Sequence, residues 1–344
     1  MNLGLVIPCR NEARVIARKL RNLRQLDWPA GERTHRIIVV DDHSEDETSA
    51  IAQAAIDELE FPSHVKVEVI SNRVQPGKPG AVRAGLTQLG SSVSCCGLSD
   101  ADVILDLGVP RQVLEAFEEN AELVMLSGEQ SFVDALPESG VPDESMVAAA
   151  DAYDRATAWW RGVESRFGAL FSVHGQLLIW RTELGLEPEL DLAADDLDLM
   201  LQARECRPRG EISLLPGATF FECKTPTGSA RHAQALRRAR AYVQVLQTRA
   251  MPPRQSIGRK IQWLGYRYLP FAAPSATLVC MFMGLLIAAL LWGAAGCAIA
   301  GAVLLLGAWT PPGQTWLRTM RMIRLAQRAE AQSTLGGQWE MARN

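Results

Sequence analysis

The sequence predicts an α/β fold in which a doubly wound, mainly parallel sheet is followed by a C-terminal helical membrane hairpin. Two observations lead to this prediction. Short apolar runs alternate with stretches of helical periodicity over the first hundred residues, and the fifty consecutive residues 268–317 carry no charge. Alternating strands and helices are typical of a parallel sheet covered by helices, whereas an uncharged run of that length is typical of membrane segments.

The N-terminal part supplies four predicted strands and three predicted helices. Apolar runs indicate strands at residues 3–7, 36–40, 65–70 and 93–98. Apolar residues at helical spacing indicate helices at 12–26, 46–59 and 80–89, and Ser44 is expected to cap the second of them. Doubly wound sheets bind ligands at the carboxyl ends of their strands. The runs PCRNE, DDHS and SDAD each follow a strand, so we expect them at one edge of the sheet.

Charge is distributed unevenly along the chain. The formal net charge is only −4, but the segment from Cys223 to Ala329 contains fourteen Lys and Arg and no Asp or Glu. The remainder carries 39 acidic and 21 basic residues. Basic segments suit nucleic acid or anionic lipid. The uncharged run inside this segment favours lipid, so we expect a membrane partner and no nucleic acid.

The uncharged run divides into two apolar segments, 272–291 and 294–309. Trp292, Gly293 and Gly296 lie near the join and would allow a tight turn. The eight Leu, Ile, Val or Phe between residues 276 and 294 favour insertion by about 2.5–5 kcal/mol. Basic residues flank both outer ends, which predicts a hairpin at the inner (cytoplasmic) membrane with the remainder of the chain facing the cytoplasm. The alternatives are a re-entrant hairpin and a buried hairpin of a soluble protein.

Several other classes of protein are not indicated. No GxGxxG follows the first strand and no GxxxxGK[ST] is present, so neither a dinucleotide-binding fold nor a P-loop enzyme is predicted. The seven cysteines show no metal-type spacing, and no basic region precedes the first apolar run. A reduced cytosolic environment and no secretory signal are therefore expected.

Two pairs of carboxylates suggest chemistry by themselves. Asp100 and Asp102 form a DxD pattern directly after the fourth strand. One or two carboxylates together with substrate phosphates commonly hold Mg²⁺, and the alternative is a plain polar loop. Asp195 and Asp196 open the run DDLDL at a predicted helix start. Acids there either complement the helix dipole or act as a general base.

Six motifs occur in the order of a known family. VIPCRNE, IIVVDDHSEDET, PGKPGAVRAGL, LSDADVIL, HGQLLIWR and DDLDL together resemble the family 2 glycosyltransferases with a GT-A fold, over about residues 3–240. The resemblance implies a GT-A nucleotide-sugar-binding domain and a UDP-linked donor. It also implies that Asp100 and Asp102 hold Mg²⁺ or Mn²⁺, and that Asp196 is the general base with Asp195 beside it, where the family more often has Glu.

The resemblance further assigns the two substrates to separate groups of residues. It places His174 and Gly175 on the acceptor side. The run QALRR occupies the position of QxxRW in membrane-bound synthases of the family, with Arg238 in place of Trp. The implied donor-binding residues are Pro8, Arg10, Glu12, Asp41, Asp42, Lys78, Asp100, Gln234, Arg237 and Arg238. The structural alternatives for these positions are a helix cap, a plain turn and an interfacial helix.

These inferences combine into one expected organisation. We expect a catalytic domain at 1–225, interfacial amphipathic helices at 226–270, a transmembrane or re-entrant hairpin at 271–311 and a basic cytoplasmic tail at 312–344. The expected activity is that of a membrane-bound, metal-dependent, inverting hexosyltransferase that moves a sugar from a nucleotide-diphosphate donor to a lipid, lipid-linked or glycan acceptor. The alternatives are a processive polysaccharide synthase subunit, a non-catalytic nucleotide-sugar-binding membrane subunit and a sugar nucleotidyltransferase.

Overall fold

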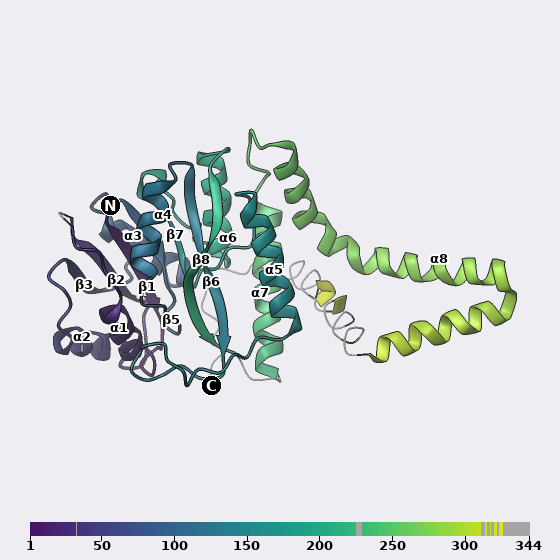
Figure 1. Ribbon diagram of the computed structural model, residues 1–344, viewed down its shortest axis with the longest axis horizontal. Coiled ribbons are helices and arrows are strands. Elements are labelled where there is room, and N and C mark those ends of the chain that lie inside the picture. Colours follow the sequence, from purple (N-terminus) through teal and green to yellow (C-terminus); the bar gives the residue numbers. More distant parts are fainter. Residues whose placement is uncertain are drawn as a thin grey trace. The chain divides into compact units, whose positions relative to one another are not determined.

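The computed structural model describes residues 1–31, 33–224, 229–310, 314, 317, 320–321 and 323–325 (Figure 1). They divide into two units. The first contains Met1–Ala230 and Pro252–Gln255, and the second contains Arg231–Met251 and the described residues from Ser256 onward. The predicted boundary at residue 225 and most of the predicted tail at 312–344 fall outside the described residues. The predicted domain limits therefore stay predictions.

Residues 3–98 form a four-stranded parallel part of the sheet. Its strands pair in parallel in the order β3-β2-β1-β4. Their bounds are β1 Leu3–Cys9, β2 His35–Asp41, β3 Val65–Ser71 and β4 Cys95–Leu98. The intervening helices are α1 Ile16–Gln25, α2 Thr48–Glu58 and α3 Lys78–Leu89. The predicted doubly wound order is confirmed, and β1 is buried along its whole length, as continuous apolar strands of parallel sheets are.

The predicted cap of α2 is wrong. The helix begins at Thr48, and the residue before it makes no side-chain capping hydrogen bond. Ser44 Oγ instead accepts a hydrogen bond from Asn11 N at 3.0 Å, in the loop after β1. Asp46 Oδ1 accepts from Thr48 N at 3.0 Å. Ser44 lies a full turn before the helix, so its hydroxyl joins two loops rather than satisfying the first helical N–H groups.

Residues 104–223 complete a mixed sheet of eight strands in the order β3-β2-β1-β4-β7-β6-β8-β5. β7 is antiparallel to both β4 and β6, β5 is antiparallel to β8, and β6 and β8 are parallel. The elements are β5 Ile104–Leu105, α4 Val109–Glu119, β6 Leu123–Val133, α5 Ala152–Arg166, β7 Leu178–Arg181, α6 Asp195–Cys206 and β8 Glu211–Cys223. β7 therefore lies between the two parallel parts of the sheet.

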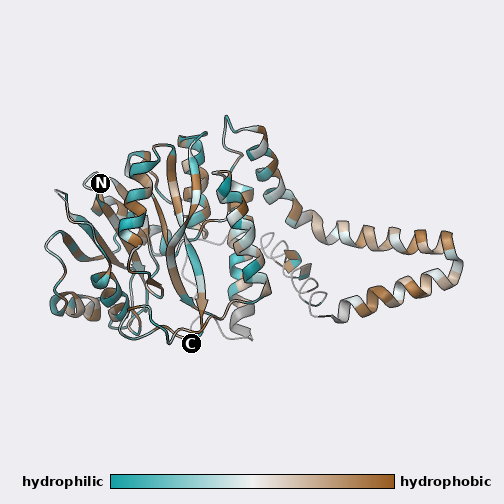
Figure 2. Cartoon of the chain, viewed as in Figure 1, coloured by the Kyte–Doolittle hydropathy of each residue, from teal (hydrophilic) through white to brown (hydrophobic). Residues whose placement is uncertain are grey.

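The core of the first unit lies between the sheet and the helices. In Figure 2 hydrophobic colouring covers much of the strands, although β6 also has a hydrophilic stretch, and the helices of this unit carry both kinds of residue. Leu5 and Ile7 of β1 pack in one buried cluster with Ile16, Leu20 and Leu23 of α1. Burying such side chains stabilises the fold by about 1.5–3 kcal/mol each relative to exposure. This packing fixes α1 against the strand that leads into the first polar loop.

The second unit contains α7 Ser229–Thr248 and α8 Ile257–Trp309. α8 is broken at Gly293, which has a φ of 62°, and the helix doubles back there (Figure 1). Cys297 Sγ donates a hydrogen bond to Leu285 O at 3.5 Å across this turn. A Cβ added at Gly296 would lie 2.4 Å from Ala288 O, so the close approach of the two arms requires glycine. The hairpin turn therefore lies where the sequence predicted it.

The apolar part of α8 is exposed. Among the described residues, Ser275–Gly307 is long and apolar enough to cross a membrane, with a mean hydropathy of 2.3. Only 6% of its most apolar stretch is buried. A hairpin in the core of a soluble protein would be covered by other elements, and the described residues show no such cover over most of this stretch.

We expect Gly97→Ala to destabilise the first unit. A Cβ at Gly97 in β4 would lie 2.3 Å from Leu178 O and 2.8 Å from Ile179 Cα of β7, and neither backbone atom can move aside easily. Overpacking of this kind costs about 1–3 kcal/mol. The melting temperature should therefore fall by several degrees, since about 2–4 °C accompanies each kcal/mol at this size.

Gly162→Ala in α5 is the matched control, because nothing lies within 4 Å of its added Cβ. Alanine is favoured over glycine in a helix by about 0.5–1 kcal/mol, so this variant should be neutral or slightly more stable. Equal melting temperatures for the two variants would contradict the close pairing of β4 with β7.

Candidate active site

The loops after β1 and β2 are joined by hydrogen bonds at the carboxyl edge of the sheet. Asn11 N donates to Ser44 Oγ at 3.0 Å, and Glu12 N donates to Thr48 Oγ1 at 2.8 Å. Asn11 and His43 both have a φ of 55°. Positive φ is uncommon outside glycine and tends to occur at functional sites. The first two predicted donor-binding loops therefore form one rigid unit.

The two acids at the end of β2 have different surroundings. Asp42 is fully buried, and its Oδ1 and Oδ2 accept hydrogen bonds from Asn72 Nδ2 at 2.6 Å and Gly77 N at 2.7 Å. Asp41 is half-buried, and its Oδ1 has no hydrogen-bond partner in the described structure. Asp42 therefore holds the loop before α3, while Asp41 Oδ1 is buried without a partner, and the donor role of Asp41 stays a prediction.

Lys78 connects acids that are far apart in the sequence. Its Nζ lies 2.9 Å from Asp100 Oδ1 and 3.7 Å from Asp195 Oδ2. Burial works against the charge of Lys78, but the carboxylates of Asp100, Asp195 and Asp196 outweigh it and raise the pKa of this lysine above its usual value. Lys78 is therefore held as a cation between the DxD loop and the start of α6.

The pair of acids at the start of α6 is also asymmetric. Asp195 is 4% exposed, and burial raises its pKa to about 6, an effect that Lys78 reduces and that Asp196 and Asp100 reinforce. Its Oδ2 has no hydrogen-bond partner in the described structure, since 3.7 Å from Lys78 Nζ is too long for one. Asp196 is half-buried, and its Oδ2 accepts from Gly175 N at 3.3 Å.

Gly175 brings the predicted acceptor loop against this cluster. A Cβ added there would lie 3.4 Å from both Lys78 Nζ and Asp196 Cβ. The structure thus places Gly175 beside the predicted base. His174 is 7% exposed, and its ring packs edge-on against Phe220 with centroids 5.3 Å apart. That packing is structural, and the acceptor role of His174 stays a prediction.

The DxD loop suits a divalent cation together with a phosphate ligand. Asp100 and Asp102 are both half-buried on the loop after β4. No cluster of three or more His, Cys, Asp or Glu able to hold a metal occurs in the described part of the chain. Two carboxylates without a closed protein cage are what Mg²⁺ uses when substrate phosphates supply other ligands. The residues therefore fit Mg²⁺ or Mn²⁺ bound with a diphosphate.

A buried lysine behind the DxD loop was missed by the sequence-based predictions. Lys19 of α1 is 0% exposed, and its Nζ donates to Ser99 Oγ at 2.7 Å and Val103 O at 3.1 Å. Burial lowers its pKa to about 7, although Asp100 and Asp102 favour its charged form. The sequence could have indicated that Lys19 is buried, because it lies three residues after Ile16 and therefore on the apolar face of the predicted helix.

The other predicted site residues are less informative. Pro8 is buried in β1, and Arg10 Nε has no hydrogen-bond partner in the described structure. Asp198 is fully buried, and its Oδ2 accepts from Glu189 N and Gln202 Nε2, both at 2.9 Å, which supports a structural role. The donor roles of the remaining predicted residues, which lie on α7 in the second unit, stay predictions: Gln234, Arg237 and Arg238.

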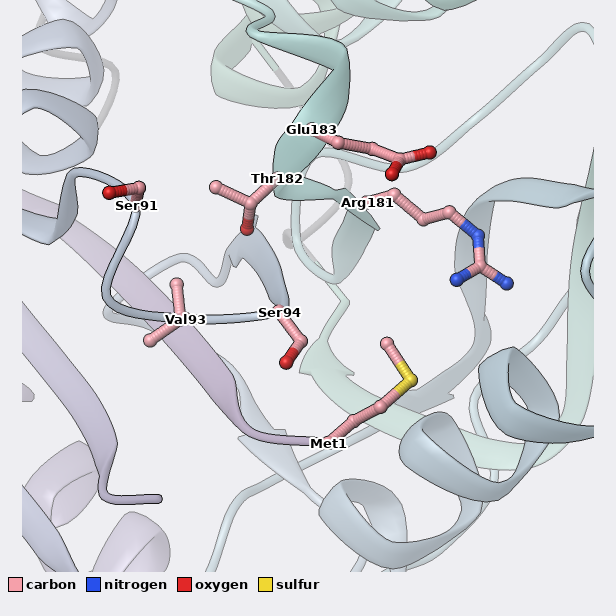
Figure 3. A pocket seen from close by; sticks show the side chains of 7 residues that line it. All are labelled: Met1, Ser91, Val93, Ser94, Arg181, Thr182 and Glu183. Atoms are coloured by element: carbon pink, nitrogen blue, oxygen red, sulfur yellow. The ribbon is translucent and has the colours of Figure 1, made fainter.

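A separate cavity lies away from this cluster. It is lined by residues that include Met1, Ser94 and Arg181 (Figure 3). Met1 lies two residues before β1 and Ser94 one residue before β4, so the cavity lies at the amino-terminal edge of those strands. Arg181 already donates to the carbonyl groups of three residues there. The cavity is therefore not part of the carboxyl-edge site.

Comparison with solved structures identifies the fold. The mannosyltransferase PcManGT from Pyrobaculum calidifontis, solved with GDP-Man and Mn²⁺, is similar with a TM-score of 0.70 and 19% identity, over 96% of this chain and 87% of that one. Residues 1–349 of S. aureus TarS, solved with UDP-GlcNAc, are similar with a TM-score of 0.51 and 18% identity, over 98% and 93%. The sheet and its helices form a GT-A fold.

Comparison of sequences identifies the family. A poly-beta-1,6-N-acetyl-D-glucosamine synthase of Staphylococcus epidermidis is 26% identical over 126 residues, which are 37% of this chain. That match spans 28% of the length of the synthase. The family model "Glycosyl transferase family 2" matches residues 5–169, which contain most of β1, all of β2–β4, the DxD loop and Lys78. Residues 5–169 of this chain therefore form a glycosyltransferase domain of family 2.

Proposed function

We propose that this protein transfers a sugar from a nucleotide-diphosphate donor, UDP-linked, to an acceptor hydroxyl, with inversion at the anomeric carbon. The observation that carries the proposal is the position of Lys78. Its ammonium lies 2.9 Å from Asp100 of the DxD loop and 3.7 Å from Asp195, next to the proposed base. A cation for a diphosphate and a base for a hydroxyl thus lie in one site.

The donor side is proposed to bind through its nucleotide and its diphosphate. Asp41, with an unpaired carboxylate oxygen, is suited to accept hydrogen bonds from the nucleotide. Asp100 and Asp102 would hold Mg²⁺ or Mn²⁺, which supplies stabilisation of the negative charge on the leaving diphosphate. Lys78 adds a positive charge at the same place. The GDP-Man and Mn²⁺ bound to PcManGT and the UDP-GlcNAc bound to TarS support this assignment.

Of the two acids on α6, Asp196 is proposed as the base. A general base must lie within hydrogen-bond reach of the hydroxyl from which it takes the proton. Asp195 is 4% exposed and faces Lys78, whereas Asp196 is half-buried beside Gly175 of the acceptor loop. Asp195 is proposed to hold Lys78 in place. A single displacement assisted by Asp196 accounts for inversion.

The acceptor is proposed to be a lipid or a lipid-linked glycan at the inner membrane, with the catalytic domain facing the cytoplasm. The exposed apolar arms of α8 and its basic flank, Arg259, Lys260 and Arg267, support membrane binding. The similarity to a polysaccharide synthase favours a second candidate, a processive synthase subunit. Product length separates these two. A non-catalytic subunit is disfavoured, because a protein that only binds the donor has no use for a base, whereas Asp196 is present together with Asp100 and Asp102.

We expect Asp196→Asn to bind donor normally and to transfer sugar about 10²–10⁴-fold more slowly, because asparagine accepts a hydrogen bond but cannot take a proton at neutral pH. Transfer would be measured from radiolabelled UDP- and GDP-sugars into total lipid extract. Nucleotide binding would be measured separately by calorimetry.

Asp198→Asn is the matched control for this variant. Its carboxylate oxygen accepts from Glu189 N and Gln202 Nε2, which an asparagine oxygen can still do. It should transfer sugar far faster than Asp196→Asn. Transfer within about threefold of wild type in Asp196→Asn would show that this acid serves only the helix, since Asn and Asp cap helices about equally well.

We expect Lys78→Gln to weaken binding of UDP-GlcNAc and GDP-mannose by about 10–100-fold, because a charge-assisted hydrogen bond contributes about 1.5–3 kcal/mol. Lys66→Gln is the control, since Lys66 is exposed on β3. Calorimetry on the purified full chain would measure both. Equal affinities in the two variants would remove Lys78 from the donor site.

We expect the full chain to sediment with membranes and to stay there at 1 M salt, where the Debye length falls to about 3 Å and electrostatic attachment is screened. A chain truncated near Pro252 lacks α8 and should leave the membrane fraction. Identical fractionation of both forms in the soluble fraction would contradict membrane attachment through α8.

A further inference from the structure

Helix α1 presents two buried polar side chains to the segment that carries the DxD acids. The first is Lys19, whose Nζ donates to Ser99 Oγ at 2.7 Å and to Val103 O at 3.1 Å. These two contacts lie on either side of Asp100 and Asp102. Lys19 therefore holds the DxD turn at both of its ends.

The second side chain, Asn22, lies one helical turn further along and is also 0% exposed. Its Nδ2 donates to Leu105 O at 2.8 Å and its Oδ1 accepts from Leu105 N at 2.8 Å, so the amide pairs with both backbone groups of that residue. Its Nδ2 also donates to Gly140 O at 2.9 Å. Asn22 thus fixes the exit of the same segment.

Ser99 extends this contact to the acceptor loop. Its Oγ receives the hydrogen bond from Lys19 and donates to Gln176 O at 3.0 Å. Gln176 follows Gly175, which lies beside Asp196. A single buried hydroxyl therefore links α1, the DxD loop and the loop next to the proposed base.

Burial of these polar groups is costly without specific hydrogen bonds. A buried polar group without a partner costs about 1–3 kcal/mol, and an isolated buried charge costs more. Their neighbours on the same helix, Ile16, Leu20 and Leu23, form ordinary apolar packing. Lys19 and Asn22 instead make directional hydrogen bonds. Within the segment that carries the DxD acids, these bonds go to Ser99, Val103 and Leu105, which lie before and after Asp100 and Asp102.

We propose that Lys19 and Asn22 are positioning residues that set the geometry with which Asp100 and Asp102 bind a divalent cation. This inference rests on the metal site of the proposed function. Removal of a group that orients metal ligands commonly lowers metal affinity by about 10–100-fold. The two residues act on the path of the backbone rather than on the cation itself.

Because Lys19 is charged, a positioning role and a purely electrostatic role predict opposite effects of its replacement on cation binding. Removing a positive charge near two carboxylates would by itself strengthen cation binding. Removing the hydrogen bonds would weaken it by loosening the loop. Asn22 carries no charge, so its replacement reports on geometry alone.

The experiment measures binding of MnCl2 to the purified full chain in detergent by calorimetry, with UDP or GDP present. We expect Lys19→Met and Asn22→Leu, which keep the unbranched and branched shapes of the two side chains, to weaken Mn²⁺ binding by about 10–100-fold. Ser99→Ala removes only the hydroxyl that Lys19 contacts and should also weaken Mn²⁺ binding. This smaller change keeps the test decisive if Lys19→Met or Asn22→Leu does not fold. Leu23→Ala is the control for general loss of stability on α1, and its Mn²⁺ affinity should match wild type.

Amide hydrogen exchange gives a second measurement that does not depend on metal. A peptide covering residues 99–105 should exchange faster in Lys19→Met and Asn22→Leu than in Leu23→Ala at matched stability. Mn²⁺ affinity and exchange equal to those of Leu23→Ala would overturn the proposal. Tighter Mn²⁺ binding in Lys19→Met with no change in Asn22→Leu would also overturn it, in favour of charge.

Asp102→Asn separates this inference from the proposed function. If wild type binds Mn²⁺ and Asp102→Asn does not, the metal site stands and the α1 variants decide the inference alone. If wild type fails to bind Mn²⁺ with either nucleotide, the metal site fails and the positioning role fails with it.

Discussion

The site depends on one ammonium group, that of Lys78. Carboxylates from the DxD loop and from the start of α6 approach the same point, and like charges that close disfavour ionisation. Lys78 lies 2.9 Å from Asp100 and 3.7 Å from Asp195 and offsets this repulsion. Lys78 also reduces the rise that burial causes in the pKa of Asp195.

The fold fixes that ammonium through a buried acid. Asp42 at the end of the β2 run accepts a hydrogen bond from Gly77 N, and Gly77 immediately precedes Lys78. Gly77 has a φ of 126°, a conformation that a side chain would strain. α3 therefore starts at a point determined by β2. Asp42, which the sequence predicted to bind the donor, therefore contributes to the site by fixing the position of Lys78.

The two faces of the DxD loop have opposite environments. On one face, Lys78, Asp100 and Asp196 are partly exposed. On the other, Lys19 and Asn22 are fully buried and hydrogen-bonded to the backbone or to Ser99. A loop held rigidly from behind keeps its ligands in position before the substrate arrives, which is the condition for effective electrostatic stabilisation.

Local patterns in the sequence determined the first four strands and their helices, the DxD pair, the acids that open α6 and the turn at Gly293. Periodicity, glycine position and the absence of charge are properties of neighbouring residues, so they can be recognised without the fold. Only the tertiary structure decided that β7 inserts antiparallel beside β4, that Asp42 is buried, that Lys78 meets Asp195 and that Lys19 lies behind the DxD loop. Each of these depends on segments that are distant along the chain, and the charge state of a buried lysine or carboxylate is set by neighbours that only folding brings together.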